Sequence, residues 1–315
     1  MSKAATFQDP MFQDEDKARE ALEAVRWPDG PICPHCGNSD QNKIAKVEGK
    51  KHSHRPGLYY CNECKGQFTV TVGSVFDRSK VPLTKWWMAA HMMNSGKNGV
   101  SAHEIHRALN VTYKTAWFMM HRLREAMVDA TPSPMGSNGG NVQADEAYHL
   151  NTSPRAKGYI KGQSKRKRAQ ILALVDEDTG SVRTFHVKGY LTAATIQDIL
   201  FQNVMRKATL VTDESNLYTE MGREFSDHQT MKHTAMEYVN AMGFTTNNVE
   251  NFFGVFKRGM RGTYTFCGEQ HLQCYLTEFQ FRYNNRSGLG ISDGERTAIA
   301  LKGIEGKRLT YRSTH

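Results

Sequence analysis

The sequence predicts a multi-domain α+β protein, in which a small cysteine-bearing unit and a helical unit precede an α/β sheet domain. Three observations support this prediction: two closely spaced cysteine pairs, a helical pattern from Thr84 to Met127, and short β runs beyond a stretch rich in Pro, Ser and Gly. The expected parts are an N-terminal helix and cysteine unit (1–78), a helical unit (79–130), a linker (131–140), the sheet domain (141–290) and a C-terminal extension (291–315).

The charge balance is basic, with 41 Lys and Arg against 32 Asp and Glu and a formal net charge of +9. Such a balance favours polyanionic partners. No apolar run approaches the roughly 20 residues of a membrane helix, and residues 1–10 lack the basic and then apolar layout of a signal peptide. We therefore expect a cytoplasmic protein without a membrane partner, whose cysteines serve metals or cores rather than disulfides.

The cysteine unit contains two Cys-x-x-Cys knuckles with 24 residues between them, formed by Cys33, Cys36, Cys61 and Cys64. Two such knuckles supply four thiolates, which complete a closed tetrahedral zinc site. The alternatives are a redox pair or an iron–sulfur cluster. The spacing favours structural Zn²⁺, with ribbon strands at Tyr59-Tyr60 and from Gln67 to Val72. Such a metal organises the fold and says little about the activity.

The helical unit has the layout of a helix-turn-helix. Ser101 is placed to cap the first helix, with Glu104 at the capping-box position. Asn110 is suited to the turn because Asn tolerates a left-handed backbone. The expected buried residues are Ile105, Ala108 and Leu109 on the first helix, and Ala116, Met120 and Leu123 on the second.

The second helix, from about Tyr113, is expected to present basic and polar residues to DNA. These are Lys114, Thr115, His121, Arg122 and Arg124. A second helix of this kind can enter a major groove. The alternative is an ordinary helical hairpin with a basic face; the cysteine unit and the net charge favour DNA binding.

The sheet domain is predicted from four β runs, with one helix before the last run and two after it. The expected strands are Val142–Tyr148, Ala169–Val175, Val182–Val187 and Ala208–Thr212. The expected helices are Ala193–Arg206, Val249–Arg258 and Gln270–Tyr283. This order is typical of a mixed sheet covered by helices.

Three separated carboxylates of this domain are candidates for chemistry. Asp145 lies on the first strand, and its neighbour Glu146 is expected to point to the opposite face, so that only one of the two lines a given site. Asp213 ends the last strand, where α/β sheets commonly bind ligands. Glu250 and Lys257 lie seven residues apart on one helix and therefore share a face.

A converging set of carboxylates suits a hard divalent cation such as Mg²⁺. Two such ions can assist an in-line displacement at phosphorus. Taken singly, each of these residues would be interpreted as a solvated surface charge. Their order and setting on two strand positions and a following helix favour a shared metal site.

A basic segment from Arg155 to Arg168 contains seven Lys and Arg and no acidic residue. Its last four residues, Lys165, Arg166, Lys167 and Arg168, are candidate phosphate contacts beside the first strand. The alternative is a solvated loop.

The sequence resembles bacterial insertion-sequence transposases of the DDE class with an N-terminal zinc ribbon. The resemblance runs from Arg26-Trp-Pro-Asp-Gly-Pro-Ile-Cys-Pro-His-Cys-Gly37 to Arg286, and its most specific part is Asn248-Val-Glu-Asn-Phe-Phe-Gly-Val-Phe-Lys-Arg-Gly259. It implies a C-terminal ribonuclease-H-like α/β catalytic domain with the triad Asp145, Asp213 and Glu250, and with Lys257 contacting DNA.

The resemblance also implies Mg²⁺ or Mn²⁺ as the catalytic cofactor, metal-dependent strand cleavage and strand transfer, and double-stranded DNA (terminal repeats and target) as the partner. A homodimer or higher multimer on DNA, in the bacterial nucleoid, is expected. Some members are described with Asn at the third position, so Asn247, interpreted as a helix N-cap, is the alternative to Glu250. The alternative functions are a non-catalytic DNA-binding regulator derived from a transposase, and a ribonuclease-H-like nuclease.

Overall fold

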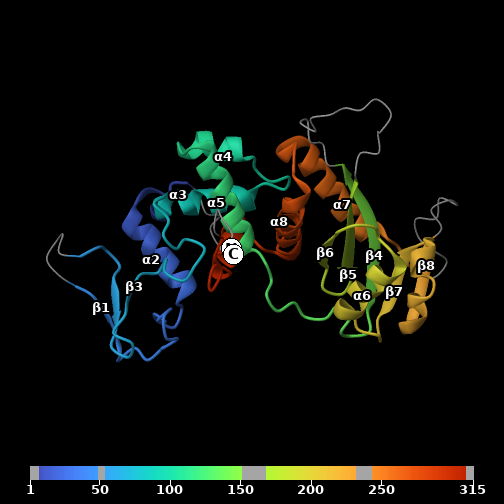
Figure 1. Cartoon of the computed structure of the whole chain (residues 1–315), viewed down its shortest axis with the longest axis horizontal. Helices are drawn as coiled ribbons and strands as arrows, with labels where there is room; N and C mark the ends of the chain where they lie inside the picture. Colours follow the sequence, from blue (N-terminus) through green and yellow to red (C-terminus); the bar gives the residue numbers. More distant parts are fainter. Residues whose placement is uncertain (1–6, 49–53, 151–167, 232–242, 310–315) are drawn as a thin grey trace. The chain divides into compact units, whose positions relative to one another are not determined.

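The computed structural model describes residues 7–48, 54–150, 168–231 and 243–309 (Figure 1). It divides into two compact units: Met1–Val128 together with Asn285–His315, and Asp129–Asn284. Among the helices in these described ranges, none is both long enough and apolar enough to cross a membrane.

The first unit begins with a helix packed on a small antiparallel sheet. The elements are α1 (Pro10–Gln13), α2 (Glu15–Arg26), β1 (Ile44–Lys46), β2 (Tyr59–Cys61) and β3 (Gln67–Phe68). Asp14 caps α2 by accepting from the backbone N–H groups of Asp16 and Lys17. Trp27 then packs edge-on against Tyr59 at 5.5 Å between ring centroids. These aromatic contacts form the apolar side of the ribbon.

Three helices follow in this unit: α3 (Leu83–Ser95), α4 (Ala102–Leu109) and α5 (Tyr113–Ala126). The predicted capping box at the start of α4 is present, with the Ser101 side chain accepting from Glu104 N and the Glu104 carboxylate accepting from Ser101 N. Asn110 adopts the left-handed conformation, with φ 48°. The layout expected for a helix-turn-helix is therefore formed, although Ala108 is exposed rather than buried.

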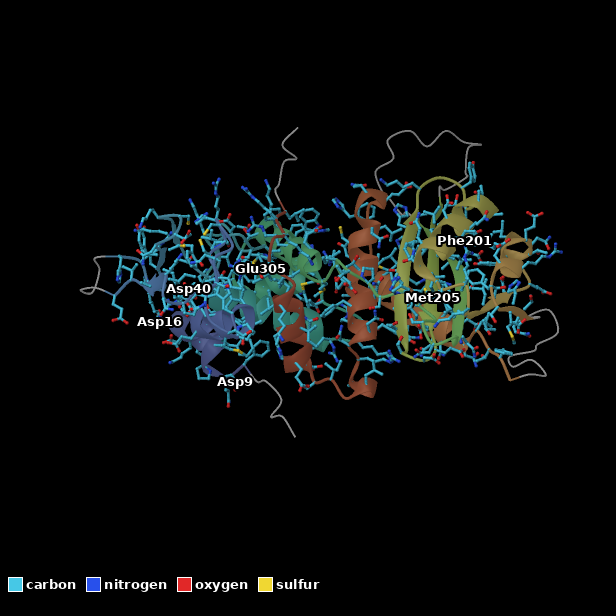
Figure 2. The ribbon with its side chains drawn as sticks, turned by 90° about the horizontal axis from the view of Figure 1, so that it is seen from below. Asp9, Asp16, Asp40, Phe201, Met205 and Glu305 are labelled. Carbon is cyan, nitrogen blue, oxygen red and sulfur yellow. The ribbon has the colours of Figure 1, made fainter. Side chains whose placement is uncertain are left out.

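The C-terminal segment belongs to the first unit and carries a helix that the sequence analysis did not predict, α9 (Asp293–Lys302). Its start is a second capping box, made by Ser292 and Glu295. The buried Arg296 donates to Asn94 O at 2.6 Å. Glu305, labelled in Figure 2, lies 3.5 Å from the guanidinium of Arg26. Two buried arginines thus connect this segment to the body of the unit.

The second unit is built on a five-stranded mixed sheet with the order β6-β5-β4-β7-β8. The strands are β4 (Asn141–Leu150), β5 (Arg168–Asp176), β6 (Ser181–Val187), β7 (Thr209–Asp213) and β8 (Asp227–Met231). β4, β5 and β6 pair antiparallel, whereas β7 is parallel to both β4 and β8. The predicted fold class is confirmed to the extent that the second unit is a mixed α/β sheet domain. The polar strand β8 was not predicted from the sequence.

Helices cover the two faces of this sheet. On one face, α6 (Ala193–Asn203) packs through Ile196 and Leu200 on a core that includes Val142, Ala144 and Leu172. The other face carries α7 (Asn247–Gly259), whereas α8 (Leu272–Asn284) packs beside β6 at the edge of the sheet. Alternation along β4 therefore sends even-numbered residues to the α6 side and odd-numbered residues to the α7 side.

The outer edge of β6 is covered by side-chain amides from α8, which lies beside it in Figure 1. The oxygens of Asn284, Gln280 and Gln273 accept the backbone N–H groups of Val182, Thr184 and His186 at 2.7–2.9 Å. An exposed edge strand would otherwise present these donors to another chain.

Candidate active site and cysteine knuckles

Asp145 and Asp213 stand level with each other on two parallel strands. The pairing between β4 and β7 ends at Gln143 and Val211. Continuing the same register by two residues brings Asp145 opposite Asp213, the last residue of β7. No ladder bond joins the strands at this level, so the two carboxylates meet where the sheet opens.

Glu146 joins these two carboxylates, and the expectation that it would be excluded from their site is wrong. Single ligand atoms of Asp145, Glu146 and Asp213 lie within 4.8 Å of one another. The side chains do leave β4 on opposite faces, but Asp145 Oδ1 turns back to accept from Glu146 N at 2.7 Å. Because β7 ends at this level, the longer Glu146 side chain can reach the same opening.

This group is poorly solvated and rich in negative charge. Burial, reinforced by the charges of Asp213 and Glu250, raises the pKa of Asp145 to about 6, while Lys257 acts in the opposite direction. Burial and the charge of Asp213 raise the pKa of Glu146 to about 7. Desolvated carboxylates held close together favour protonation unless a cation neutralises them.

Helix α7 brings Glu250 and Lys257 to the same region. Its apolar stripe of Val249, Phe252, Phe253 and Phe256 is buried, as predicted. Glu250 accepts a hydrogen bond from Thr246 Oγ1 at 2.8 Å. The charges of Glu250 and of Lys257 both act on Asp145. The Glu250 carboxylate is nevertheless outside the compact group formed by the other three acids.

The start of α7 is held by Gln143, a buried residue that the sequence analysis did not single out. Its Oε1 accepts the backbone N–H groups of Asn248 and Val249, each at 3.1 Å. Its Nε2 donates to Glu177. A polar residue between the apolar Val142 and Ala144 was the available signal. Gln143 therefore fixes the helix that carries Glu250 to the strand that carries Asp145.

Asn247 does not serve as the N-cap of α7. It is the first helical residue and is exposed, whereas the buried Thr246 occupies the capping position. The reason is the buried contact of Gln143 with the next two backbone N–H groups, which sets where the helix begins.

In the first unit, the four cysteines of the knuckles converge. Their four Sγ atoms all lie within 4.8 Å of one another. The Sγ atoms of Cys33 and Cys64 are 3.6 Å apart, and those of Cys36 and Cys61 are 3.8 Å apart. A tetrahedral ion with metal–sulfur bonds of about 2.3 Å requires sulfur–sulfur distances of about 3.8 Å. Backbone N–H groups of Cys64 and Glu63 contribute to lowering the pKa of Cys61 to about 6. The donor set therefore fits a four-thiolate metal site.

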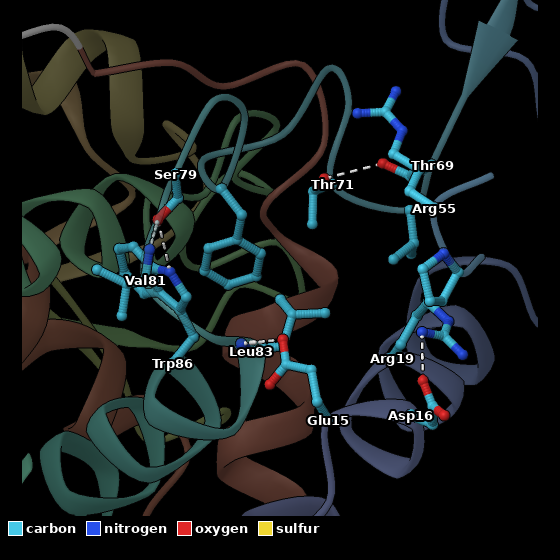
Figure 3. Close-up of a pocket in the computed structure, with 13 residues that line it drawn as sticks. Glu15, Asp16, Arg19, Arg55, Thr69, Thr71, Ser79, Val81, Leu83 and Trp86 are labelled. Atoms are coloured by element: carbon cyan, nitrogen blue, oxygen red, sulfur yellow. Dashed lines mark hydrogen bonds and ion pairs between the residues drawn. The ribbon is translucent and has the colours of Figure 1, made fainter. Parts of the chain in front are cut away.

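A cavity of about 300 Å³ also lies in the first unit (Figure 3). Its polar groups are engaged by the fold itself: Glu15 accepts from Leu83 N at 2.7 Å, and Ser79 Oγ accepts from Trp86 Nε1 at 3.0 Å. Arg19 pairs with Asp16 at 2.8 Å. This cavity lies between α2, the ribbon and α3. Asp145, Glu146 and Asp213 are not among the residues that line it.

Two family models match the chain. Residues 138–284 match a family described as "ISXO2-like transposase domain", and residues 13–67 match one described as "Transposase zinc-ribbon domain". The chain therefore contains a region similar to the ISXO2-like transposase domain and a region similar to the transposase zinc ribbon. These two matches confirm the resemblance to transposases with an N-terminal zinc ribbon.

A curated relative and three solved structures are similar to this chain. The relative, from Halobacterium salinarum, is described as "Uncharacterized protein in transposable element ISH50"; it is 24% identical over 286 residues, which are 86% of this chain and 91% of the relative. A chain of a simian T-cell lymphotropic virus intasome in complex with PP2A regulatory subunit B56 gamma is 14% identical with a TM-score of 0.31, and the match covers 56% of this chain and 63% of that chain.

The other two structures are a Mos1 transposase paired-end complex with left transposon end, and a Drosophila P element transposase strand transfer complex. The first is 12% identical, with a TM-score of 0.21 and coverage of 57% of this chain and 75% of that one. The second is 11% identical, with a TM-score of 0.29 and coverage of 72% and 64%.

Of the residues expected to face DNA, Lys114 is exposed on the first turn of α5. Arg122 is partly buried, donates to Asp77 O at 3.3 Å, and lies over the Phe118 ring. Arg124 is only 1% exposed, and His121 is only 3% exposed. The structure therefore removes Arg124 and His121 from the DNA-facing set, because α5 packs on more than one side and buries them.

Most of the basic segment lies outside the described residues. Lys165, Arg166 and Lys167 lie outside the described residues, and Arg168 is the first residue of β5, paired with Leu150. The phosphate contact expected for these four residues remains a prediction.

Proposed function

We propose that this protein is a transposase, which cuts DNA at the ends of its element and joins the released ends to target DNA. The observation that carries the proposal is the approach of Asp145 and Asp213 at the opening between β4 and β7. The charge of Glu250 on α7 also acts on Asp145. The match of residues 138–284 to the ISXO2-like transposase domain supports the same reaction class.

The proposed site has carboxylate oxygens as its donors, which suits Mg²⁺ or Mn²⁺. The buried Glu146 Oε1, which makes no hydrogen bond within the described part of the chain, also fits a nearby cation. Such ions, when bound, would activate the attacking oxygen and stabilise the leaving oxygen of an in-line displacement. We propose that Asp145, Asp213 and Glu250 hold them.

The protein residues have binding and orienting roles in this proposal. Lys257 is exposed near Asp145 and would bind a DNA phosphate beside the acidic group. In the first step a water oxygen bonds to phosphorus as the P–O bond at the element end breaks. The released 3′-hydroxyl oxygen then bonds to a phosphorus of the target DNA as a P–O bond of the target strand breaks. No side chain acts as the nucleophile, so no covalent protein–DNA intermediate forms.

We further propose that the first unit recognises the element ends. Helix α5 would enter the major groove with Lys114 near its leading end, and zinc held by the four cysteines would maintain the ribbon. Assembly as a dimer or higher multimer would bring two ends together.

The test is strand cleavage and strand transfer on DNA that carries the element ends, with Mg²⁺ and the full chain. Asp213→Asn is expected to reduce cleavage at least about 100-fold while DNA binding is retained, because the amide removes the charge that holds the cation. Glu224→Gln, an exposed acid of the same unit, is the matched control. Cleavage without joining would support the nuclease alternative, and binding without cleavage by the wild-type chain would support the regulator.

A further inference from the structure

We propose that Glu146 binds a divalent cation together with Asp145 and Asp213, and that the buried Tyr218 hydroxyl positions its carboxylate. This inference rests on the proposed function and adds a residue outside the Asp145, Asp213 and Glu250 set. Its basis is the three-carboxylate group within 4.8 Å and two buried oxygens that lack partners in the described residues.

The first argument is the position of Glu146. It lies two residues after the buried Ala144 on the α6 side of β4 and is itself half-buried. Its Oε1 is buried and makes no hydrogen bond to any described residue. A buried carboxylate oxygen without a partner is costly, so such groups are normally paired, protonated or bound to a metal.

The second argument is Tyr218, which is fully buried in the short helix η1 (Asn216–Tyr218). Buried tyrosine hydroxyls usually find a partner. This one makes no hydrogen bond within the described ranges. Tyr218 lies in the α6-side core with Ala144 and with Leu172, the strand partner of Glu146, and Glu146 is the charge that acts on it most strongly. The Glu146 carboxylate is therefore the expected acceptor of the Tyr218 hydroxyl.

The third argument is how the chain places Tyr218. Asp213 Oδ1 accepts from Ser215 N at 3.0 Å, and Ser215 Oγ then caps η1 through Leu217 N. The turn that holds one carboxylate of the group thus also directs Tyr218 toward another. Tyr218 approaches from the α6 side, whereas Glu250 approaches from the α7 side.

These contacts assign different roles to the two acidic side chains outside the Asp145–Asp213 pair. Glu146 belongs to the compact group with both aspartates, and Glu250 does not. We therefore expect cation affinity in the absence of DNA to depend on Glu146 as strongly as on Asp213. Tyr218, which acts through Glu146, is a positioning residue.

The experiment titrates the full chain with Mn²⁺, following the paramagnetic signal of unbound Mn²⁺, and also measures the Mn²⁺ concentration for half-maximal DNA cleavage. Glu146→Gln and Asp213→Asn are each expected to weaken Mn²⁺ binding by more than about tenfold; Tyr218→Phe should weaken it by at most about tenfold. Glu224→Gln is the matched control and should bind as the wild type does. Saturating Mn²⁺ should restore cleavage to Tyr218→Phe, which a merely structural defect would not permit.

Two outcomes overturn the inference in distinguishable ways. If Asp213→Asn loses Mn²⁺ and Glu146→Gln stays within about twofold of the wild type in both measurements, Glu146 is not a ligand, and the proposed function stands. If neither substitution changes binding or cleavage, the proposed acidic site fails as well. Glu146→Asp, which keeps the charge on a shorter side chain, serves if Glu146→Gln does not fold, and should bind Mn²⁺ more weakly than the wild type.

Discussion

The side-chain oxygen of Gln143 accepts the backbone N–H of Val249 at 3.1 Å, which attaches the first turn of α7 to strand β4. A second N–H, that of Asn248, is accepted by the same oxygen. Asp145 lies two residues after Gln143 on β4, and Glu250 directly follows Val249 on α7. This buried contact therefore controls the spacing between the two carboxylates.

Gln143→Met should destabilise the second unit and loosen the start of α7. The substitution leaves two N–H groups without their acceptor, which costs roughly 1–3 kcal/mol for a buried group. Thermal unfolding should move to lower temperature, and the amides of Asn248 and Val249 should exchange faster with solvent. Gln202→Met, at an exposed position on α6, is the control. Unchanged exchange at both amides would contradict the positioning role.

Glu250→Gln should abolish strand cleavage, whereas Asn247→Ala should leave most of it. Glu250 influences Asp145 directly, while Asn247 is exposed and is not the helix cap. The measurement is cleavage of end-bearing DNA at fixed Mg²⁺, with binding checked separately. If Asn247→Ala is inactive and Glu250→Gln is active, the third residue of the catalytic triad is Asn247 and not Glu250.

Stabilisation by Mg²⁺ should grow as pH rises. The pKa values of Asp145 and Glu146 are raised to about 6 and about 7 from 3.8 and 4.5. The cation-free folded state therefore binds more protons than the unfolded chain between about pH 4 and pH 7, and its free energy of unfolding falls as pH rises through that window. A bound cation replaces those protons.

The check is the Mg²⁺-induced shift in the unfolding temperature of the second unit at about pH 5.5 and about pH 8. The shift should be larger at the higher pH, and Asp145→Asn should reduce the difference. An equal shift at both values in the wild type would show that these carboxylates do not bind the cation.

Removal of zinc should unfold the ribbon and leave the sheet of the second unit intact. The ribbon strands are only two or three residues long, so the metal supplies much of their stability. Metal analysis should find one zinc per chain, lost in Cys61→Ser and retained in Cys274→Ser. Amide exchange after chelation should rise in the ribbon and not in β4–β8. Iron–sulfur absorbance in the purified protein would exclude this assignment.

Lys114→Ala and Arg124→Ala should differ in kind. Substitution of the exposed Lys114 is expected to weaken binding to DNA and to reduce the salt dependence of binding by about one phosphate contact. Substitution of the buried Arg124 should instead lower the stability of the first unit. Lys302→Ala, an exposed residue on α9 with the same charge change, is the control. An unchanged salt slope for Lys114→Ala would move recognition to another surface.

Local chemistry in the sequence determined several parts of this protein before any tertiary contact. Three features depend on neighbours within a few residues and can therefore be recognised in the sequence. They are the Ser101–Glu104 capping box, the left-handed Asn110 and the Cys-x-x-Cys knuckles. The main strands and the apolar stripe of α7 follow from periodicity. Strand β8 was missed because its polar sequence has no such period, and α9 was missed although Ser292 and Glu295 carry the same capping pattern.

Only the tertiary structure decided which acids meet. Alternation along β4 correctly sends Asp145 and Glu146 to opposite faces, but it cannot reveal that β7 ends level with them and leaves an opening that both side chains reach. The burial of Arg124 and the contact of Gln143 with Val249 likewise depend on elements distant in the chain. Periodicity describes one element at a time, whereas a site is made by the ends of several elements packed together.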